Sequence, residues 1–370
     1  MTFDELSTPC LLLDRERLDR NLARMAATTQ AAGVRLRPHL KTAKAAAIAA
    51  RLTDDHQRGI TVSTLREAEY FADHGATDIV YAVGIAPARL DQAAALLARG
   101  VDLKLLLDTV AAAQAVAAHG APFQVLIEVD CGDHRGGVAP DSALLVAIAA
   151  VLSGSAATLR GVLTHAGHAY RVTGADALAA VAEDERRAVV TAAERLRGAG
   201  AAVDFVSGGS TPSALVRRCS DGLTELRAGV YMFFDLDQQS RGVCRREEIA
   251  LSVLATVIGH NEAARKVLLD AGGLALSKDT GATVFRPEVG YGEVCDVRSC
   301  RPLPGLYVQS VSQEHGHVPL GPKHDFAALP VGSRVRVLPN HACMTAAAYD
   351  AYEVVEGDRV VERWSRVNGW

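Results

Sequence analysis

Long apolar runs, basic clusters and an even set of cysteines are all missing from this 370-residue sequence. No stretch approaches the roughly 20 apolar residues that span a bilayer, which argues against a membrane protein. The net charge is −4 and no basic run stands out, so neither nucleic acid nor an anionic membrane is an expected partner. The first residues lack the basic and then apolar pattern of a signal peptide. Because the seven cysteines are scattered and odd in number, we expect a soluble, cytoplasmic protein.

A dinucleotide-binding fingerprint is missing too, since no GxGxxG follows the first predicted strand. Instead, short apolar runs alternate with alanine-rich helical segments from about residue 34 to 235. The predicted strands are Val34–Pro38, Ile60–Thr64, Ile79–Val83, Leu103–Asp108, Phe123–Asp130, Leu159–His165, Val203–Ser207 and Glu225–Phe233. Eight such strands with helices between them predict an α/β fold, a parallel sheet closed into a (β/α)8 barrel of the TIM type. A doubly wound open sheet is the alternative, and the missing fingerprint counts against it.

The segments between these strands have the composition and length of helices. Predicted helices include Arg15–Ala32, Thr42–Leu52, Leu65–His74, Pro87–Ala98 and Ala175–Gly198.

The texture of the sequence changes after about residue 240. Valine, threonine, glycine and proline become common, and alternating runs such as Arg334–Leu338 and Tyr352–Val355 predict a second, β-rich domain. The early run Cys10–Leu13 is predicted to be a strand that pairs with this domain. We therefore expect a barrel of residues 14–240 and a C-terminal β domain formed by residues 1–13 and 241–370.

The segment Arg37-Pro-His-Leu-Lys-Thr-Ala43 places Lys41 at the end of the first predicted strand. The active site of such a barrel lies where the strands end, and a lysine there can form a Schiff base with a cofactor aldehyde. Arg37 and His39 are expected to help set its surroundings. An isolated lysine is more often a solvated surface charge, so this interpretation depends on the rest of the site.

The segment Ser207-Gly-Gly-Ser-Thr-Pro-Ser213 is the predicted phosphate cradle. Two glycines allow the backbone to approach an anion, Ser210 or Thr211 can cap the next helix, and Pro212 suits its first turn. The helix N-terminus would then present N–H groups to a phosphate. The predicted cofactor-binding residues here are Ser207, Gly208, Gly209, Ser210 and Thr211. An ordinary strand-to-helix turn with a good cap is the alternative.

Further polar side chains follow other predicted strands. A buried guanidinium at Arg135 would bind the phenolic oxygen or ring nitrogen of a pyridine cofactor, whereas a surface ion pair is the alternative. His165 and His168 flank a glycine at a strand end and are candidate catalytic residues, although a barrel histidine is more often structural. His165, Tyr170 and Tyr231 are candidate cofactor-binding residues as well.

The segment Pro339-Asn-His-Ala-Cys343 carries the candidate metal pair. In an extended segment, residues two apart point to the same face, so His341 and Cys343 could hold one ion. Imidazole and thiolate suit zinc, and a two-residue ligand set leaves positions open for water or substrate. The alternative is a hydrogen-bonded histidine beside a buried cysteine. His315 and His317 are candidates for lining the same cleft or supplying a further ligand.

Taken together, these segments resemble the fold-type III pyridoxal-phosphate enzymes, the alanine-racemase-like group, and within it the metal-dependent D-serine dehydratase and D-threonine aldolase family. The resemblance covers essentially the whole chain. It implies that Lys41, and not Lys44, binds pyridoxal phosphate, that His341 and Cys343 bind a divalent metal, and that the chain forms a homodimer with the site near the subunit interface. The His-x-Cys pair is similar to that of zinc-bound dehydratases, whereas the aldolases often carry His-x-Asp with manganese or magnesium.

The resemblance implies a lyase for β-hydroxy D-amino acids, of the D-serine dehydratase type, which eliminates water and gives an α-keto acid and ammonia. A D-threonine aldolase would instead yield glycine and an aldehyde, with His165 or His168 as base. A racemase needs a second acid/base that no tyrosine motif clearly supplies. A non-catalytic pyridoxal-phosphate carrier would resemble the barrel alone, and an adaptor protein would bind no cofactor. D-Serine, D-threonine and 3-hydroxy-D-aspartate all remain open as substrates.

Overall fold

The computed structural model describes residues 2–52 and 59–370. The chain divides into two compact units. The barrel unit comprises residues 24–229 and 367–370, and the β unit comprises residues 1–23 and 230–366. Within the described residues, no helix has the length and apolarity needed to cross a membrane. The functional division at residues 13 and 240 stays a prediction.

The barrel unit is built on eight parallel strands. They are β2 (Arg35–Pro38), β3 (Gly59–Val62), β4 (Asp78–Gly84), β5 (Asp102–Leu107), β6 (Gln124–Val129), β7 (Thr158–Thr164), β8 (Phe205–Gly208) and β9 (Glu225–Ala228). Their order in the sheet is β2-β9-β8-β7-β6-β5-β4-β3. A bridge between His39 and Thr61 links the two outer strands, with the Leu40 N–H donating to Thr61 O at 2.8 Å. The barrel is therefore nearly closed, which confirms the predicted (β/α)8 fold and excludes the open sheet.

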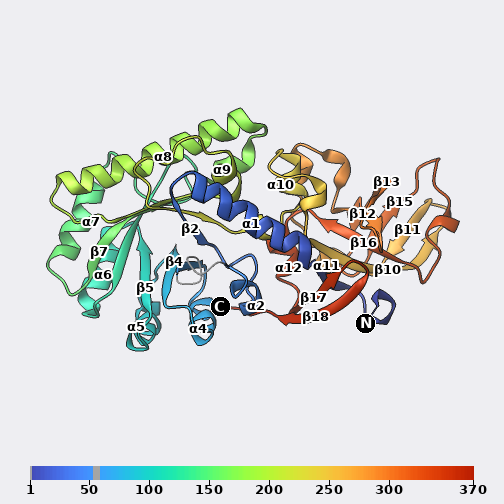
Figure 1. The fold of residues 1–370 in the computed structure, drawn as a ribbon, viewed down its shortest axis with the longest axis horizontal. Coiled ribbons are helices and arrows are strands. Elements are labelled where there is room, and N and C mark those ends of the chain that lie inside the picture. Colours follow the sequence, from blue (N-terminus) through green and yellow to red (C-terminus); the bar gives the residue numbers. More distant parts are fainter. Residues whose placement is uncertain (1, 53–58) are drawn as a thin grey trace. The chain divides into compact units, whose positions relative to one another are not determined.

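Helices follow the strands on the outer side of the barrel (Figure 1). They are α2 (Ala46–Ala49), α4 (Leu65–Asp73), α5 (Leu90–Ala98), α6 (Val110–His119), α7 (Leu144–Ser153), α8 (Ala175–Gly198) and α9 (Thr211–Val216). Several begin at a side-chain cap, because the hydroxyls of Thr64, Thr109 and Ser210 accept N–H groups of the first turn. Helix α1 (Arg15–Ala31) contains the boundary between the two units, at residues 23 and 24.

Two predicted elements are shorter in the structure because the backbone turns sharply. Strand β9 ends at Ala228, whereas the prediction ran to Phe233; a 3-10 helix, η4 (Val230–Met232), follows it. Gly229 lies so close to the loop after β2 that a Cβ there would be 2.7 Å from His39 O. The predicted helix 42–52 is reduced to α2 because Lys44 has a φ of 50° and closes a turn on Leu40.

The barrel interior contains an apolar cluster and a charged cluster. Val80, Leu106, Leu126, Leu163 and Phe205, one from each of strands β4 to β8, form the apolar cluster. The charged cluster is centred on the Arg37 guanidinium, which lies 2.7 Å from a Glu225 oxygen and 2.8 Å from an Asp78 oxygen. Lys104 pairs with the same Asp78 at 2.9 Å. Buried charges need partners, and these ion pairs engage Arg37 within the barrel scaffold. The sequence predicted instead that Arg37 helps to set the surroundings of Lys41.

The β unit is a mostly antiparallel assembly. Its strands are β1 (Cys10–Asp14), β10 (Leu251–Asn261), β11 (Lys266–Leu269), β12 (Gly292–Asp296), β13 (Pro302–Tyr307), β14 (Ser310–Val311), β15 (Gly316–Pro319), β16 (Arg334–Pro339), β17 (Ala351–Glu356) and β18 (Arg359–Ser365). Short helices α10 (Leu236–Ser240), α11 (Gly273–Leu276) and α12 (Ala342–Ala346) accompany them. Strand β1 pairs antiparallel with β10 and parallel with β17, which confirms that the early strand joins the second domain.

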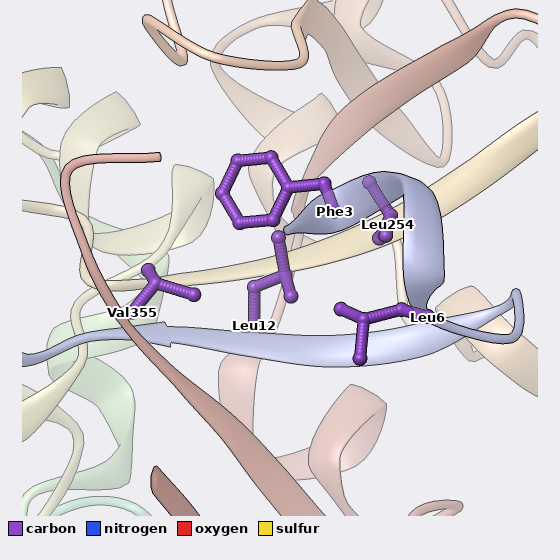
Figure 2. Packing of buried hydrophobic residues seen from close by; sticks show 5 residues of the cluster. All are labelled: Phe3, Leu6, Leu12, Leu254 and Val355. Carbon is purple, nitrogen blue, oxygen red and sulfur yellow. The ribbon is translucent and has the colours of Figure 1, made fainter. Parts of the chain in front are cut away.

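The N-terminal segment is fixed to this sheet by a small apolar cluster. Figure 2 shows Phe3 and Leu6 packed with Leu12, Leu254 and Val355, all of which are buried. Burial of these side chains, together with the pairing of β1 with β10 and β17, stabilises the position of residues 3–14 in the β unit.

Candidate active site

Lys41 is exposed on the loop after β2. Its backbone N–H donates to His39 Nδ1 at 3.5 Å. Burial and then the Lys41 charge lower the pKa of both His39 and His165, with Arg227 adding to the effect. Lys41, His39, His165 and Arg227 are therefore brought together at one end of the barrel.

His165 follows β7 and has a defined tautomer. Its Nδ1 lies 3.2 Å from Gly209 O, and because a carbonyl only accepts, Nδ1 must carry the hydrogen. Nε2 is then left as an acceptor. Burial and the Lys41 charge lower the pKa of His165 to about 3, so the imidazole is neutral near pH 7.

The predicted phosphate cradle has the expected local structure. Ser210 is the N-cap of α9, and its capping box with Ser213 is complete. Other contacts reduce the number of N–H groups that this segment could donate to an anion. The Gly209 N–H donates to Glu185, and the Ser213 N–H donates to Ser210 Oγ. Thr211 is buried at the start of α9. The φ of Gly209 is 120°, and a Cβ there would lie 2.6 Å from Arg227 O, so close strand packing already requires this glycine.

Ser207 and Arg227 face each other across neighbouring strands. The Arg227 guanidinium donates to Ser207 Oγ at 2.5 Å and also to Thr164 O, while Ser207 Oγ donates to Glu225 at 2.8 Å. Burial lowers the pKa of Arg227 to about 10, which still leaves it cationic at neutral pH. Ser207 is thus engaged inside the barrel, and Arg227 places a buried positive charge beside the histidines.

Arg135 differs from its prediction. Its side chain is 57% exposed and forms an ion pair with Glu128 at 3.2 Å, so the buried guanidinium expected from the sequence is wrong. The reason is its place in a glycine-rich loop that Asp108 and Asp130 hold from the strand ends. The Arg135 charge nonetheless contributes to the lowered pKa of His165.

His168 and Tyr170 lie on the 3-10 helix η3 (Gly167–Arg171). The Nδ1 of His168 is buried and has no hydrogen-bond partner among the described residues. A Cβ at Gly132 would be 3.7 Å from the His168 ring, which places that ring against the loop after β6. Tyr231 belongs to the β unit, on η4, where burial raises the pKa of its phenol.

His341 and Cys343 lie at the start of α12 in the β unit. His341 Nδ1 is 2.7 Å from Asp279 Oδ2, and the Cys343 thiol is hydrogen-bonded to the same imidazole. Burial opposes the charged imidazole, but Cys343 and then Asp279 outweigh it and raise the pKa of His341 to about 11. The hydrogen bond from His341 in turn lowers the pKa of Asp279.

The physical reason for the pairing differs from the prediction. The pair is not on an extended strand, because β16 ends at Pro339 and His341 is the N-cap of a helix. Among the residues that the structure describes, no group of three or more histidine, cysteine or acidic side chains could hold a metal. Neither His315 nor His317 joins His341 and Cys343 in such a group among the described residues, and His317 Nε2 lies 3.2 Å from Ser312 Oγ.

Sequence reasoning missed two acidic residues that support these sites. Glu185 in α8 had a signal, since it falls on the apolar stripe that includes Leu178, Ala182, Val189 and Leu196. Asp279 had none, because it lies outside any helix or strand and reaches His341 only through the fold.

Comparisons with known proteins identify the family. The model of the alanine racemase N-terminal domain matches residues 13–237, and that of the serine dehydratase domain matches residues 250–355. The chain belongs to the fold-type III pyridoxal-phosphate enzymes. It falls in their D-serine dehydratase and D-threonine aldolase family, whose members are lyases that act on D-amino acids.

Three curated relatives cover nearly the whole chain. The D-threo-3-hydroxyaspartate dehydratase of Delftia sp. (strain HT23) is 49% identical, covering 99% of this chain and 98% of its own. A D-threonine aldolase of Arthrobacter sp. is 31% identical, covering 97% and 92%. A D-serine dehydratase of Dictyostelium discoideum is 30% identical, covering 97% and 95%.

Solved structures agree with these relatives. The structure of the Delftia dehydratase has a TM-score of 0.97 and 48% identity, covering 100% of both chains. A cysteine-to-alanine variant of that enzyme, solved in the metal-free form, also has a TM-score of 0.97, with 47% identity and full coverage of both chains.

The residues present fit both groups that the family uses. At the barrel end, an exposed amine lies near two imidazoles of lowered pKa and a buried guanidinium, which suits an anionic pyridine aldehyde. In the β unit, the Asp279 contact occupies Nδ1 of His341 and leaves Nε2 for a metal beside the Cys343 sulfur. A histidine held by a carboxylate is the usual arrangement of a metal-bound imidazole.

Proposed function

We propose that this chain is a pyridoxal-phosphate- and metal-dependent dehydratase that acts on 3-hydroxy-D-aspartate. The single observation that carries the choice is the 49% identity to the Delftia dehydratase over essentially the full length of both chains. The D-serine dehydratase of Dictyostelium is only 30% identical, so D-serine, one of the three substrates that the sequence left open, becomes the second substrate to test.

On the barrel side, Lys41 would hold the cofactor through Nζ. When bound, pyridoxal phosphate supplies an electron sink for charge that develops at Cα of the amino acid. Lys41 Nζ, when it is not bonded to the cofactor, would be the base that takes the Cα proton. His165 Nε2 is unprotonated and would accept a hydrogen bond, while the Arg227 cation balances negative charge. His168, Arg135 and Tyr170 line neighbouring loops, and we assign them substrate and cofactor contacts.

On the β side, His341 Nε2 and Cys343 Sγ would hold the metal, with zinc favoured because a thiolate is a soft ligand. When bound, the metal supplies a Lewis acid for the β-hydroxyl. Loss of the Cα proton and the hydroxide removes one water from the substrate, and hydrolysis of the enamine returns it and releases ammonia. 3-Hydroxyaspartate thereby gives oxaloacetate and ammonia, and D-serine would give pyruvate.

The test is a product assay with the zinc-loaded, yellow holoenzyme. D-threo-3-hydroxyaspartate, D-serine and D-threonine are offered separately, and keto acid, glycine and ammonia are quantified in each reaction. We expect keto acid and ammonia in equal amounts from 3-hydroxyaspartate, less from D-serine, and no glycine. Glycine with an aldehyde as the main product would contradict the proposal.

Aldolase activity is the second candidate, because the Arthrobacter D-threonine aldolase is 31% identical over nearly the full chain. The neutral His165, with an acceptor at Nε2, would then remove the hydroxyl proton. Cys343 favours the dehydratase, since the hard ions manganese and magnesium prefer an oxygen ligand at this position.

We also propose a homodimer, as the family resemblance implies. Light scattering of the holoenzyme tests it, and a mass equal to one chain would contradict it.

A further inference from the structure

Glu185 on α8 is a fully buried carboxylate with partners on three elements. Its Oε1 accepts the N–H groups of Ala166 at 3.0 Å and Gly209 at 2.9 Å. Its Oε2 accepts the Ser213 hydroxyl at 3.0 Å and pairs with the Arg217 guanidinium. The side chain has 0% exposure, so every one of these contacts is made without competition from water.

These contacts close a ring around His165. Oε1 of Glu185 links Ala166, the next residue after His165, to Gly209 in the loop after β8. The Gly209 carbonyl accepts from His165 Nδ1 at 3.2 Å, which completes the ring. A single carboxylate oxygen therefore bridges the loops that follow β7 and β8, beside the Gly209 carbonyl that fixes the tautomer of His165.

An apolar residue would suit the α8 stripe better if packing were the only requirement. Burying a carboxylate is costly and is compensated here only because Arg217 and three hydrogen-bond donors surround it. Without the carboxylate, two buried N–H groups in the loops would lose their acceptor. Glu185 on α8 therefore binds the loops after β7 and β8 at the end of the barrel where the site lies.

We propose, given the assignment of pyridoxal phosphate to these loops, that Glu185 is a positioning residue of the barrel site that acts through His165 and Gly209. It does not touch substrate or cofactor. It holds the β7 and β8 loops at the separation that the cofactor requires.

Three substitutions separate this role from simple stabilisation. Glu185→Gln loses the charge paired with Arg217 but keeps a carbonyl oxygen that reaches both N–H groups. Arg217→Gln loses the same ion pair and leaves the loop contacts of Glu185 intact. Glu185→Ala removes the acceptor altogether, and Glu185→Asp, which withdraws it by one methylene, serves if the alanine variant does not fold.

The experiment measures the dissociation constant for pyridoxal phosphate by absorbance titration of each apo variant, alongside its melting temperature. We expect all variants to melt lower, while only Glu185→Ala and Glu185→Asp weaken cofactor binding, by about tenfold or more. Equal cofactor affinity in Glu185→Ala, Glu185→Gln and Arg217→Gln would overturn the proposal. Because no substrate is present, the result does not depend on which amino acid the enzyme turns over.

Discussion

His165 in the barrel and His341 in the β unit make the same kind of hydrogen bond, but their pKa values are shifted in opposite directions. Each donates a hydrogen bond from Nδ1 to an oxygen, which leaves Nε2 outside that hydrogen bond. For His165 the acceptor is a neutral carbonyl near the Lys41 and Arg227 cations, and the pKa is lowered to about 3. For His341 the acceptor is the Asp279 carboxylate, Cys343 lies beside it, and the pKa is raised to about 11. Burial lowers the pKa at both sites; at His165 the Lys41 charge adds to this effect, whereas at His341 Cys343 and then Asp279 outweigh it.

The largest expected loss of activity comes from a substitution in the barrel unit, at Lys41. Lys41→Arg keeps the positive charge but cannot bond to the cofactor aldehyde, so we expect keto-acid formation to fall on the order of 10⁴-fold. Lys44→Arg is the matched control, since it can keep the ion pair with Glu67. Turnover and cofactor absorbance are measured for both. A Lys41→Arg enzyme that is as active as Lys44→Arg would rule out the assignment.

The next largest loss of activity is expected from a substitution in the β unit, at Cys343. Cys343→Ala leaves His341 as the only member of the metal pair, and we expect turnover to fall roughly 10²–10³-fold, the worth of a lost Lewis acid. Metal content by mass spectrometry should fall with it, while pyridoxal-phosphate content stays at the wild-type value. Cys10→Ala, in the same unit, is the control. Full metal content in Cys343→Ala would show that the pair does not bind the ion.

A smaller change makes the two histidines alike. Asp279→Asn replaces the carboxylate partner of His341 with a neutral carbonyl, the kind of acceptor that His165 has. Loss of such a partner weakens metal binding by about 10–100-fold, measured by competition with a chelator of known affinity. Asp325→Asn, a helix-capping aspartate elsewhere in the β unit, should leave the metal affinity unchanged. Equal affinities in the two variants would mean that Asp279 does not support the ligand.

The smallest effect on activity is expected from Asp78, in the charged cluster of the barrel interior. Although burial opposes ionisation, Arg37 and Lys104 lower the pKa of Asp78 to about 2. Its contribution to stability is therefore complete above its ordinary value of 3.8 and is lost as the pH falls towards 2. We expect about 2 kcal/mol of acid-dependent unfolding free energy, from denaturation curves between these pH values, to vanish in Asp78→Asn. Asp102→Asn should keep it, and cofactor affinity should not change in either variant.

Features that depend only on the spacing of nearby residues could be predicted from the sequence. Features that depend on contacts made by the fold could not. Helix α8 has the predicted bounds because its alanine-rich stripe needs only its own spacing. The segments 42–52 and 225–233 were predicted too long because Lys44 has a positive φ and pairs with the distant Glu67, and because Gly229 lies against His39. His341 and Cys343 come together as expected, but at a helix start rather than on a strand. Arg135 illustrates the limit most clearly: loop residues carry no periodicity from which burial can be inferred.

The most direct test of the central claim, that the barrel holds the cofactor and the β unit the metal for one elimination, uses metal-stripped holoenzyme. D-threo-3-hydroxyaspartate is added while cofactor absorbance and keto acid are followed together, and zinc is supplied afterwards. We expect the absorbance to change at once and keto acid to appear only after zinc. Keto acid at the full rate before zinc would contradict the account.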